Sequence, residues 1–234
     1  MKLKNNNLSK KFLIYGFGKS GISSLNYLKQ KYRCFIFDDN KKKLNNKFKR
    51  FIISKSKLLN NNFDYIVISP GININRCQLS NYLKKNQKKV ITDFDIFYKF
   101  NPEVLTITIT GTNGKSTTSK LLYEILNNHN YDVRLTGNIG NPILKEVKVT
   151  KKTIFVIEAS SYQLAYSKYF KSNFSLIINI SPDHLERHNT MKNYVLSKLK
   201  CVIRQNENDI AIVTNTDLLK DLLKPKNIKS KIIY

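Results

Sequence analysis

One stretch of the chain decides its fold: Ile107-Thr108-Ile109-Thr110-Gly111-Thr112-Asn113-Gly114-Lys115-Ser116-Thr117-Thr118. Its β-branched beginning predicts a buried strand, its glycines predict a turn, and its Lys-Ser-Thr-Thr end predicts the start of a helix. Such a turn holds phosphate, because its backbone N–H groups and the positive end of the helix attract phosphate oxygens. Lys115 adds a mobile cation, and the Ser116 hydroxyl is a hard ligand for Mg²⁺. The stretch therefore predicts binding of ATP or another nucleoside triphosphate.

The turn is shorter than the common phosphate loop. That loop reads G-x-x-x-x-G-K-[ST], and Ile109 stands here in the position of its first Gly. The alternative is an ordinary Gly/Asn turn, which Gly-Lys-Ser-Thr directly after a β-branched run disfavours. The candidate ATP-binding residues are Gly111, Thr112, Asn113, Gly114, Lys115, Ser116 and Thr117.

Composition predicts a globular protein. With 234 residues, 41% hydrophobic residues, 13 Phe and 13 Tyr, the chain can bury a core in one large or two small domains. It has neither an apolar run of membrane-spanning length nor an apolar N-terminal signal, so a cytoplasmic location without membrane insertion is expected. Cys34, Cys77 and Cys201 lack metal-ligand spacing, which favours reduced structural thiols over a disulfide framework.

The net charge of +25, from 41 Lys+Arg against 16 Asp+Glu, raises nucleic-acid binding as a candidate function. The lysines are spread along the whole chain among many Asn and Ile, which indicates a compositional drift more than a selected basic patch. Lys41-Lys42-Lys43 and Lys151-Lys152 are interpreted as solvated turns. We expect no nucleic-acid partner, and a basic nucleic-acid-binding NTPase stays an alternative.

Residues 1–100 read as repeated strand–loop–helix units. A strand at 11–15 runs into Gly16-Phe17-Gly18-Lys19-Ser20-Gly21 and a helical pattern, and a strand at 34–37 ends at Asp38-Asp39. This is roughly the order and spacing of a Rossmann-type unit, in which an acidic residue reaches a ribose. Strands at 64–68 and 90–92 follow. We therefore predict a parallel sheet that binds its ligand at the carboxyl ends of the strands.

A domain boundary is predicted near Phe100-Asn101-Pro102, where the pattern restarts. The second domain, 101–234, begins with the strand that carries the phosphate loop. Its expected elements are a strand at 104–110, a helix at 117–128, strands at 153–157 and 174–180, a helix at 194–202 and a strand at 210–213. The fold class is α/β, with an N-terminal Rossmann-like parallel-sheet domain followed by a P-loop-type ATP-binding α/β domain.

Four groups that are distant in sequence lie at or just beyond strand ends: Lys115 with Ser116, Glu158, His184 and Lys198. Parallel strands gather ligands at this edge, so the set predicts Mg²⁺-assisted phosphoryl transfer. Each residue also has a plainer interpretation: Glu158 as a charge that ends a strand, His184 as a structural histidine, and Lys198 as a surface lysine.

Taken together, these residues resemble the Mur ligases. The matching blocks are Gly16 to Gly21, Ser69-Pro70-Gly71-Ile72, Thr92 to Phe97, Ile109 to Thr117, Gly137-Asn138-Ile139-Gly140, Glu158 to Leu164, Asn179 to His188, and Lys198-Leu199. They run in order over nearly the whole chain. The resemblance implies that ATP phosphorylates the carboxylate of UDP-N-acetylmuramoyl-L-alanine, and that D-glutamate attacks the acyl phosphate to give an amide in peptidoglycan precursor synthesis.

The resemblance also implies roles for single residues. Ser116 and Glu158 correspond to one Mg²⁺ site and His184 to a second, with Lys115, His184 and Lys198 in the catalytic set. Lys198 corresponds to a lysine that the family carbamylates, which requires a neutral amine, so we expect its pKa to be lowered. The glycine loop is expected to hold the substrate's uridine diphosphate instead of NAD. The candidate substrate contacts are Ser20, Asp38 or Asp39, Gly71, Asn138 and Ser160.

Length is the main departure from the family. Mur ligases continue through the central domain into a C-terminal domain, whereas this chain ends at Tyr234. We therefore expect ligase-type site residues in a C-terminally incomplete, monomeric chain, without most of the D-glutamate site. A non-catalytic or split-gene fragment, served by a complementing C-terminal fragment, is one alternative. Another Mur ligase is a second.

Overall fold

The structure is a computed structural model that describes residues 9–40 and 46–234. Lys41-Lys42-Lys43 lies outside these residues, whereas Lys151-Lys152 forms an exposed turn, as predicted. Within the described part of the chain, every helix is too short or too polar to cross a bilayer.

The first sheet has 4 parallel strands in the order β2-β1-β3-β4. Its helices and strands are β1 (Lys11–Tyr15), α1 (Lys19–Leu28), β2 (Arg33–Phe37), α2 (Lys55–Leu59), β3 (Tyr65–Ile68), α3 (Ser80–Lys85), β4 (Val90–Ile91) and α4 (Asp93–Phe100). The strands are apolar and largely buried, as expected for a parallel sheet covered on both faces. The predicted Rossmann-like unit is therefore present.

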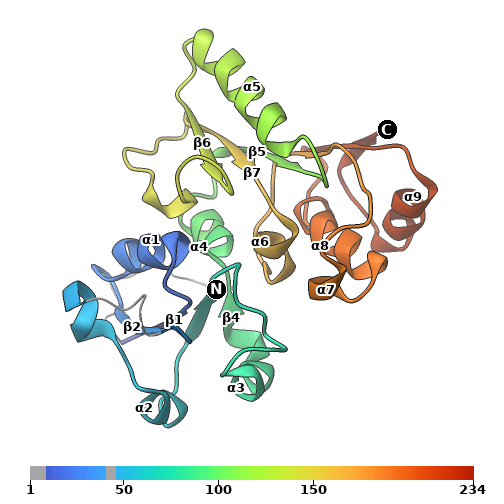
Figure 1. The fold of residues 1–234 in the computed structure, drawn as a ribbon. Helices are drawn as coiled ribbons and strands as arrows, with labels where there is room; N and C mark the ends of the chain where they lie inside the picture. Colours follow the sequence, from blue (N-terminus) through green and yellow to red (C-terminus); the bar gives the residue numbers. More distant parts are fainter. Residues whose placement is uncertain (1–8, 41–45) are drawn as a thin grey trace.

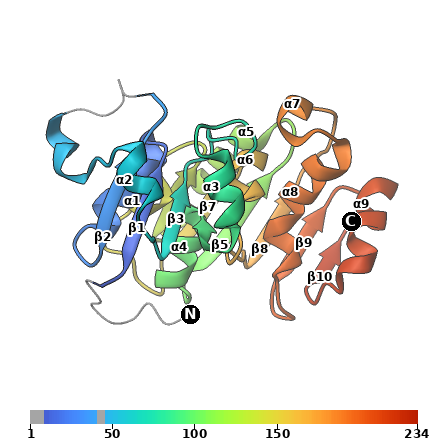
Figure 2. The ribbon, with the colours of Figure 1, turned by 90° about the horizontal axis from the view of Figure 1, so that it is seen from below.

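The second sheet has 6 parallel strands in the order β10-β9-β8-β5-β7-β6. Its helices and strands are β5 (Leu105–Thr110), α5 (Lys115–Asn128), β6 (Val133–Gly137), β7 (Ile154–Glu158), α6 (Ser161–Ala165), β8 (Phe174–Ile177), α7 (Leu185–His188), α8 (Met191–Ile203), β9 (Ile210–Val213), α9 (Asp217–Leu223) and β10 (Lys231–Ile233). Helix α5 covers one face, and α4, α6 and α8 lie toward the other (Figure 1). Figure 2 places the first sheet and strand β10 at opposite ends of the molecule.

Helix α4 joins the two sheets. Thr92 caps it, and Asp95 closes the capping box by accepting the Thr92 N–H at 2.9 Å. Farther along the helix, the rings of Phe97 and Phe155 lie 4.6 Å apart between centroids, which packs α4 against the second sheet. One hydrophobic core therefore extends across both sheets. The boundary predicted near Phe100 follows this shared helix and stays a prediction.

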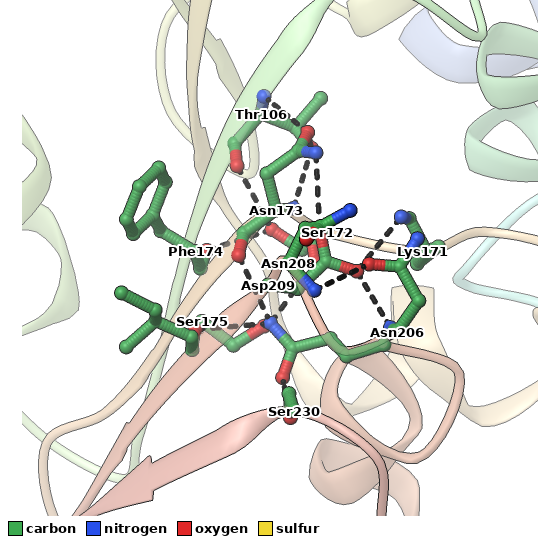
Figure 3. Close-up of polar contacts among 12 residues, drawn as sticks. Thr106, Lys171, Ser172, Asn173, Phe174, Ser175, Asn206, Asn208, Asp209 and Ser230 are labelled. Carbon is green, nitrogen blue, oxygen red and sulfur yellow. Dashed lines mark hydrogen bonds and ion pairs between the residues drawn. The ribbon is translucent and has the colours of Figure 1, made fainter.

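Polar side chains gather at the amino ends of β8 and β9, away from the phosphate loop (Figure 3). Asp209 is 2% exposed and pairs with Lys171 at 2.7 Å between Oδ2 and Nζ. It also accepts the Asn173 amide at 3.2 Å, and Asn173 accepts both the N–H and the hydroxyl of Thr106 at 3.0 Å. Gln205 donates to the Asn173 carbonyl at 3.3 Å. We call Thr106, Lys171, Asn173, Gln205 and Asp209 the amino-end cluster.

Three predicted element boundaries are wrong by two residues or more. The helix expected at 194–202 begins at Met191, because Thr190 caps it there by accepting the Asn193 N–H. The strand expected at 174–180 ends at Ile177, because Asn179 leaves the ladder to bond the phosphate loop. The helix expected at 117–128 begins earlier, at Lys115, because Gly114 in the left-handed region (φ 79°) ends the turn there.

Candidate functional site

A cavity of about 350 Å³ lies between the two sheets, and we call it the central cavity. From the first sheet's half, its walls include Ser20 at the start of α1 and Pro70 in the loop after β3. From the second, they include residues of α5, α6 and α8 and of the loop that precedes α7. The sequence-predicted site residues that line it are Ser20, Lys115, Asn138, Ser160, His184 and Lys198. The fold thus brings six separately predicted residues to one cavity.

The phosphate loop (residues 111–114) is held by Asn179. The Asn179 Oδ1 atom accepts the N–H groups of Thr112 at 3.0 Å and Asn113 at 2.8 Å, and its amide donates to the Asn113 carbonyl at 2.9 Å. Gly111 is required by close packing, since a Cβ there would lie 2.5 Å from Ile178 Cγ1. The loop is therefore preformed, with two of its amides already facing an oxygen acceptor.

Two lysines converge on one carbonyl of this loop. Lys115 Nζ donates to the Gly111 oxygen at 3.0 Å and to the Thr112 oxygen at 2.6 Å, while Lys198 Nζ reaches the same Gly111 oxygen at 2.6 Å. Burial, and then the charge of Lys115, lower the pKa of Lys198 to about 7. The lowered pKa predicted for Lys198 is thus confirmed, and a large fraction of the amine is neutral near neutral pH.

Glu158 ends β7 with one carboxylate oxygen unpartnered. Asn138 donates to its Oε1 at 2.7 Å, whereas its buried Oε2 has no hydrogen-bond partner. Glu158 lies beside Ile109 of β5 in the sheet register. Ile109 packs against α5, the helix that contains Ser116, so Glu158 is on the sheet face that α5 covers. A buried carboxylate oxygen without a donor is costly unless a cation meets it, so Glu158 fits a Mg²⁺ ligand.

The structure does not assemble a conventional metal cluster. Within the described residues, no group of three His, Cys, Asp or Glu side chains is close enough to hold an ion. Ser116 is exposed at the start of α5, and Lys198, as an ammonium, repels cations. The fit to Mg²⁺ therefore rests on the unpartnered Glu158 oxygen and on an oxygen that carbamylation of Lys198 would supply.

His184 precedes α7 in a left-handed backbone conformation, with φ 53°. Its half-exposed ring packs 4.8 Å from the Tyr162 ring, and its Nε2 lies 3.3 Å from Asp183 Oδ2. A histidine at positive φ is uncommon, and such strained residues concentrate at functional sites. The ring faces the central cavity together with the Asp183 carboxylate.

The glycine loop of the first sheet (residues 16–21) carries no converging lysines. Its Phe17 N–H donates to Asp38 Oδ2 at 2.6 Å, and Ser69 Oγ donates to the Gly16 carbonyl at 2.6 Å. A Cβ on Gly21 would lie 2.1 Å from that same carbonyl oxygen. These glycines therefore serve close packing of the loop on its own helix.

Further cavities lie at this loop and beyond Asp38. One of about 270 Å³ is lined by Ser20, Asp38 and Gly71 and adjoins the central cavity, which shares Ser20. Another of about 770 Å³ is lined by Asp38 and Asp39. The predicted substrate contacts Ser20, Gly71, Asp38 and Asp39 thus line successive cavities that share Asp38 and Ser20, and the last of these cavities is also lined by Lys115.

The two aspartates of the acidic pair differ in their surroundings. Asp38 is buried, and its oxygens accept the backbone N–H groups of Phe17 and Asn40. Asp39 is half-buried and accepts the Tyr15 hydroxyl at 2.7 Å. Asp38 therefore shapes the glycine loop, while Asp39 is the more accessible of the two.

Ser160 is the N-cap of α6, where its hydroxyl accepts the Gln163 N–H at 3.2 Å. Sequence reasoning missed three other residues at the site. Tyr194 places its hydroxyl 3.1 Å from Thr112 Oγ1, and Lys198 Nζ lies 4.6 Å from the centroid of its ring. Asp93 bonds the Ser20 side chain, and burial raises the pKa of this carboxyl to about 6.

Asn179 is the third missed residue, and its polarity within an apolar run was a weak signal. It falls inside the strand predicted at 174–180, whereas in the structure the strand ends at Ile177 and Asn179 bonds the phosphate loop. By contrast, the contacts of Tyr194 and Asp93 depend on how helices pack, which the sequence pattern does not specify.

The sequence matches two family profiles. Residues 10–92 match the profile described as Mur ligase MurD-like, N-terminal domain, and residues 109–234 match Mur ligase middle domain. Curated relatives include UDP-N-acetylmuramoylalanine–D-glutamate ligase of Rickettsia bellii (strain RML369-C), which is 36% identical over 86% of this chain and 45% of the relative. The protein of that name from Caldicellulosiruptor bescii is 34% identical over 95% of this chain and 50% of the relative. The chain spans about half the length of these relatives.

Solved structures share the fold. The UDP-N-acetylmuramate:L-alanyl-gamma-D-glutamyl-meso-diaminopimelate ligase from Neisseria meningitides matches 95% of this chain and 76% of its own, with a TM-score of 0.58 and 12% identity. A murein peptide ligase from Psychrobacter arcticus 273-4 matches 95% of this chain and 52% of its own, with a TM-score of 0.51 and 14% identity. At this identity the likeness concerns the arrangement of the sheets and helices alone.

Proposed function

The chain belongs to the Mur ligase family, and from this premise we propose that it binds UDP-N-acetylmuramoyl-L-alanine and ATP, activates the alanyl carboxylate and passes it to D-glutamate. Because the chain spans about half of its curated relatives, the activity and substrates of the whole relatives are part of the proposal. One observation carries it: Lys115, His184 and Lys198 of the second sheet face Ser20 of the first across one cavity.

The row of cavities suits a long, anionic substrate. The uridine end fits the 770 Å³ cavity beside Asp39, and the diphosphate fits the 270 Å³ cavity at the glycine loop. The sugar and its alanyl carboxylate then extend past Ser20 into the central cavity, toward Lys115. Residues 1–100 are accordingly assigned to the UDP-sugar and residues 101–234 to ATP.

Phosphoryl transfer needs positive charge near the moving phosphoryl group more than it needs covalent chemistry. Lys115 is bonded to two loop carbonyls, and a bound γ-phosphate would exchange those neutral acceptors for an anionic one. The Thr112 and Asn113 amides of the same loop donate to Asn179 Oδ1, so a bound phosphate would compete with that side chain for them. The residues Ser116 and Glu158 would hold Mg²⁺, which supplies further charge neutralisation when bound.

Carbamylation of Lys198 follows from the same electrostatics. The neutral Nζ attacks the carbon of CO₂, a C–N bond forms, and one proton leaves to solvent, which gives an N-carboxylate. The lowered pKa of Lys198 makes the attacking amine available near neutral pH. The product exchanges a buried cation for an anion beside Lys115, where it stabilises a divalent cation instead of repelling one.

Calorimetry and a chemical trap test the proposal on the 234-residue chain. We expect separate binding of ADP and of UDP-N-acetylmuramoyl-L-alanine. With ATP, Mg²⁺ and hydroxylamine, we expect the alanyl hydroxamate to form without D-glutamate, because hydroxylamine intercepts an acyl phosphate. Adding D-glutamate and measuring phosphate release then tests complete turnover.

Other outcomes select the alternatives. Binding of both ligands without hydroxamate indicates a fragment that binds but does not activate the carboxylate. Failure to bind the UDP-sugar contradicts the proposal outright. Salt-sensitive retention on duplex DNA at low ionic strength would favour the nucleic-acid-binding NTPase suggested by the charge of +25.

A further inference from the structure

Arg187 of α7 connects the two sheets on the side of their junction where the central cavity lies. We call this side the front. Its guanidinium donates to the Pro70 carbonyl at 3.1 Å and also to the Ile72 carbonyl, both in the loop that follows β3. The same group lies over two aromatic rings, 5.1 Å from the centroid of Tyr162 and 5.5 Å from that of Tyr166. A side chain from the second sheet's half of the chain thus bonds the backbone of the first sheet's half.

Each end of this bridge leads directly to a candidate site. On one side, Ser69 precedes the bonded loop and donates to the Gly16 carbonyl of the glycine loop at 2.6 Å. On the other side, Tyr162 packs 4.8 Å from the ring of His184. Pro70, Tyr162 and His184 all line the central cavity. Arg187 therefore links the two walls of that cavity.

A second junction lies at the rear and is much more strongly bonded. Asp95 of α4 accepts the Ser167 hydroxyl and the N–H groups of Lys168, Tyr169 and Phe170 at 2.7 to 2.9 Å, all on a single oxygen. Its carboxylate is buried and also completes the α4 capping box. The rear junction is fixed by a buried anion, whereas the front is held by the partly buried Arg187 and by the Ile74 N–H, which donates to the Tyr166 hydroxyl at 3.2 Å.

We propose that Arg187 is a positioning residue that sets the separation between the glycine loop and the phosphate loop. Its acceptors are backbone carbonyls, so these hydrogen bonds depend on where the loop after β3 lies and not on which side chains that loop carries. One guanidinium nitrogen, Nη2, donates to both carbonyls while the planar group lies over the Tyr162 and Tyr166 rings, and a lysine ammonium does not reproduce this combination of bonding and stacking. The ligand-related part of this inference rests on the proposed function, while its structural part does not.

Distance measurement between spin labels tests the structural part. Labels at Lys84→Cys on α3 and Lys192→Cys on α8, both exposed positions, report the separation across the front in a Cys77→Ser background. Cys34 and Cys201 are buried, and burial raises the pKa of these thiols to about 12 and about 11, so they label slowly.

Arg187→Ala should shift and broaden the distribution of distances between the two labels, and the distribution for Arg187→Lys should fall between that of Arg187→Ala and that of wild type. Arg33→Ala removes an exposed arginine elsewhere and serves as the matched control.

Calorimetry tests the ligand-related part on the same variants. UDP alone touches one wall, so Arg187→Ala should leave its affinity unchanged, whereas UDP-N-acetylmuramoyl-L-alanine, which spans both walls, should bind about tenfold more weakly. An unchanged distance distribution in Arg187→Ala would overturn the proposal, as would a shifted distribution with unchanged affinity for the spanning ligand. If wild type itself does not bind the UDP-sugar, the proposed function fails and the label distances still decide the role of Arg187. Thermal melts of all variants establish that they fold, and Arg187→Lys carries the test if the alanine variant does not.

Discussion

The two ends of the second sheet treat buried polar groups in opposite ways. At the amino end, each charged or amide side chain of the amino-end cluster has a partner, as the Lys171–Asp209 pair at 2.7 Å illustrates. Among the described residues, five buried side-chain oxygens have no hydrogen-bond partner, and those of Thr110, Thr136 and Glu158 lie at the carboxyl end. These three residues lie at or next to the ends of β5, β6 and β7.

This contrast distinguishes buried polar groups that stabilise the fold from buried polar groups that are available to a ligand. A buried group with a protein partner stabilises the fold, and a buried group without one costs free energy until a ligand arrives. The carboxyl edge, where three of these unpartnered oxygens lie, is therefore where we expect ligands to bind. Substitutions at the amino end should change stability, and those at the carboxyl end should change binding.

The largest expected effect is at the amino end. Asp209→Ala leaves the largely buried Lys171 ammonium without its partner, and we expect the free energy of unfolding to fall by about 3–5 kcal/mol. Chemical denaturation measures it, with Asp217→Ala, an acidic residue in the first turn of α9, as the control. If the free energy of unfolding falls by less than about 1 kcal/mol, the Lys171–Asp209 pair contributes no more than an ordinary surface ion pair. The proposed difference between the two ends of the sheet would then be wrong.

The pH dependence of Lys198 gives the next effect. In the unfolded chain its amine binds a proton up to the ordinary pKa of 10.5, but in the folded chain only up to about 7. Between these values the unfolded state binds more protons, so stability rises with pH, and below about 7 the destabilisation is complete. Relative to Lys198→Met, wild type should therefore gain about 2 kcal/mol between about pH 6 and about pH 9.

Thermal or chemical unfolding of both chains under CO₂-free conditions measures this difference, since carbamylation would add its own linkage. The methionine variant keeps the volume and removes the titrating group, so other residues cancel in the comparison. Parallel stability curves for the two chains across this pH range would contradict the buried-amine account.

Lys115 should affect binding and leave the fold nearly unchanged. Its Nζ bonds only loop carbonyls within its own turn, so Lys115→Ala removes little tertiary structure. We expect ADP affinity to fall about thirtyfold, the scale of one charge-assisted hydrogen bond to phosphate. Calorimetry checks this, with the exposed Lys120→Ala in the same helix as control. Equal losses in the two variants would indicate a general charge effect.

The sequence predicted the parts of the site that lie at strand ends. Glu158 ends an apolar run, and Lys115 and His184 lie just beyond the loops that follow two others. Parallel strands gather such residues at one edge. The α/β class, the first sheet and the four central strands of the second sheet followed from the same pattern, whereas the edge strands β6 and β10 were not predicted. These predictions succeeded because a strand's direction and its following loop are local properties.

The missed residues depend on packing between elements. Asn179 interrupts its predicted strand because the phosphate loop offers it backbone partners, and no local pattern reveals that competition. Arg187 bonds carbonyls 115 and 117 residues away in sequence. The position of Asp95 under the loop at 167–170 likewise appears only when α4 packs between the sheets.

Glu158→Gln gives the smallest expected effect and the sharpest test of the contrast. Oε1 already accepts from Asn138 at 2.7 Å, an acceptor that glutamine retains, and the substitution removes a buried charge whose second oxygen has no partner. The free energy of unfolding should therefore change by less than about 1 kcal/mol. Affinity for Mn²⁺ in the presence of ADP, measured by paramagnetic resonance, should fall about tenfold, and the exposed Glu124→Gln should leave it unchanged. If Glu158→Gln instead unfolds the chain like Asp209→Ala, Glu158 belongs with the structural polar groups and the carboxyl edge loses its strongest metal ligand.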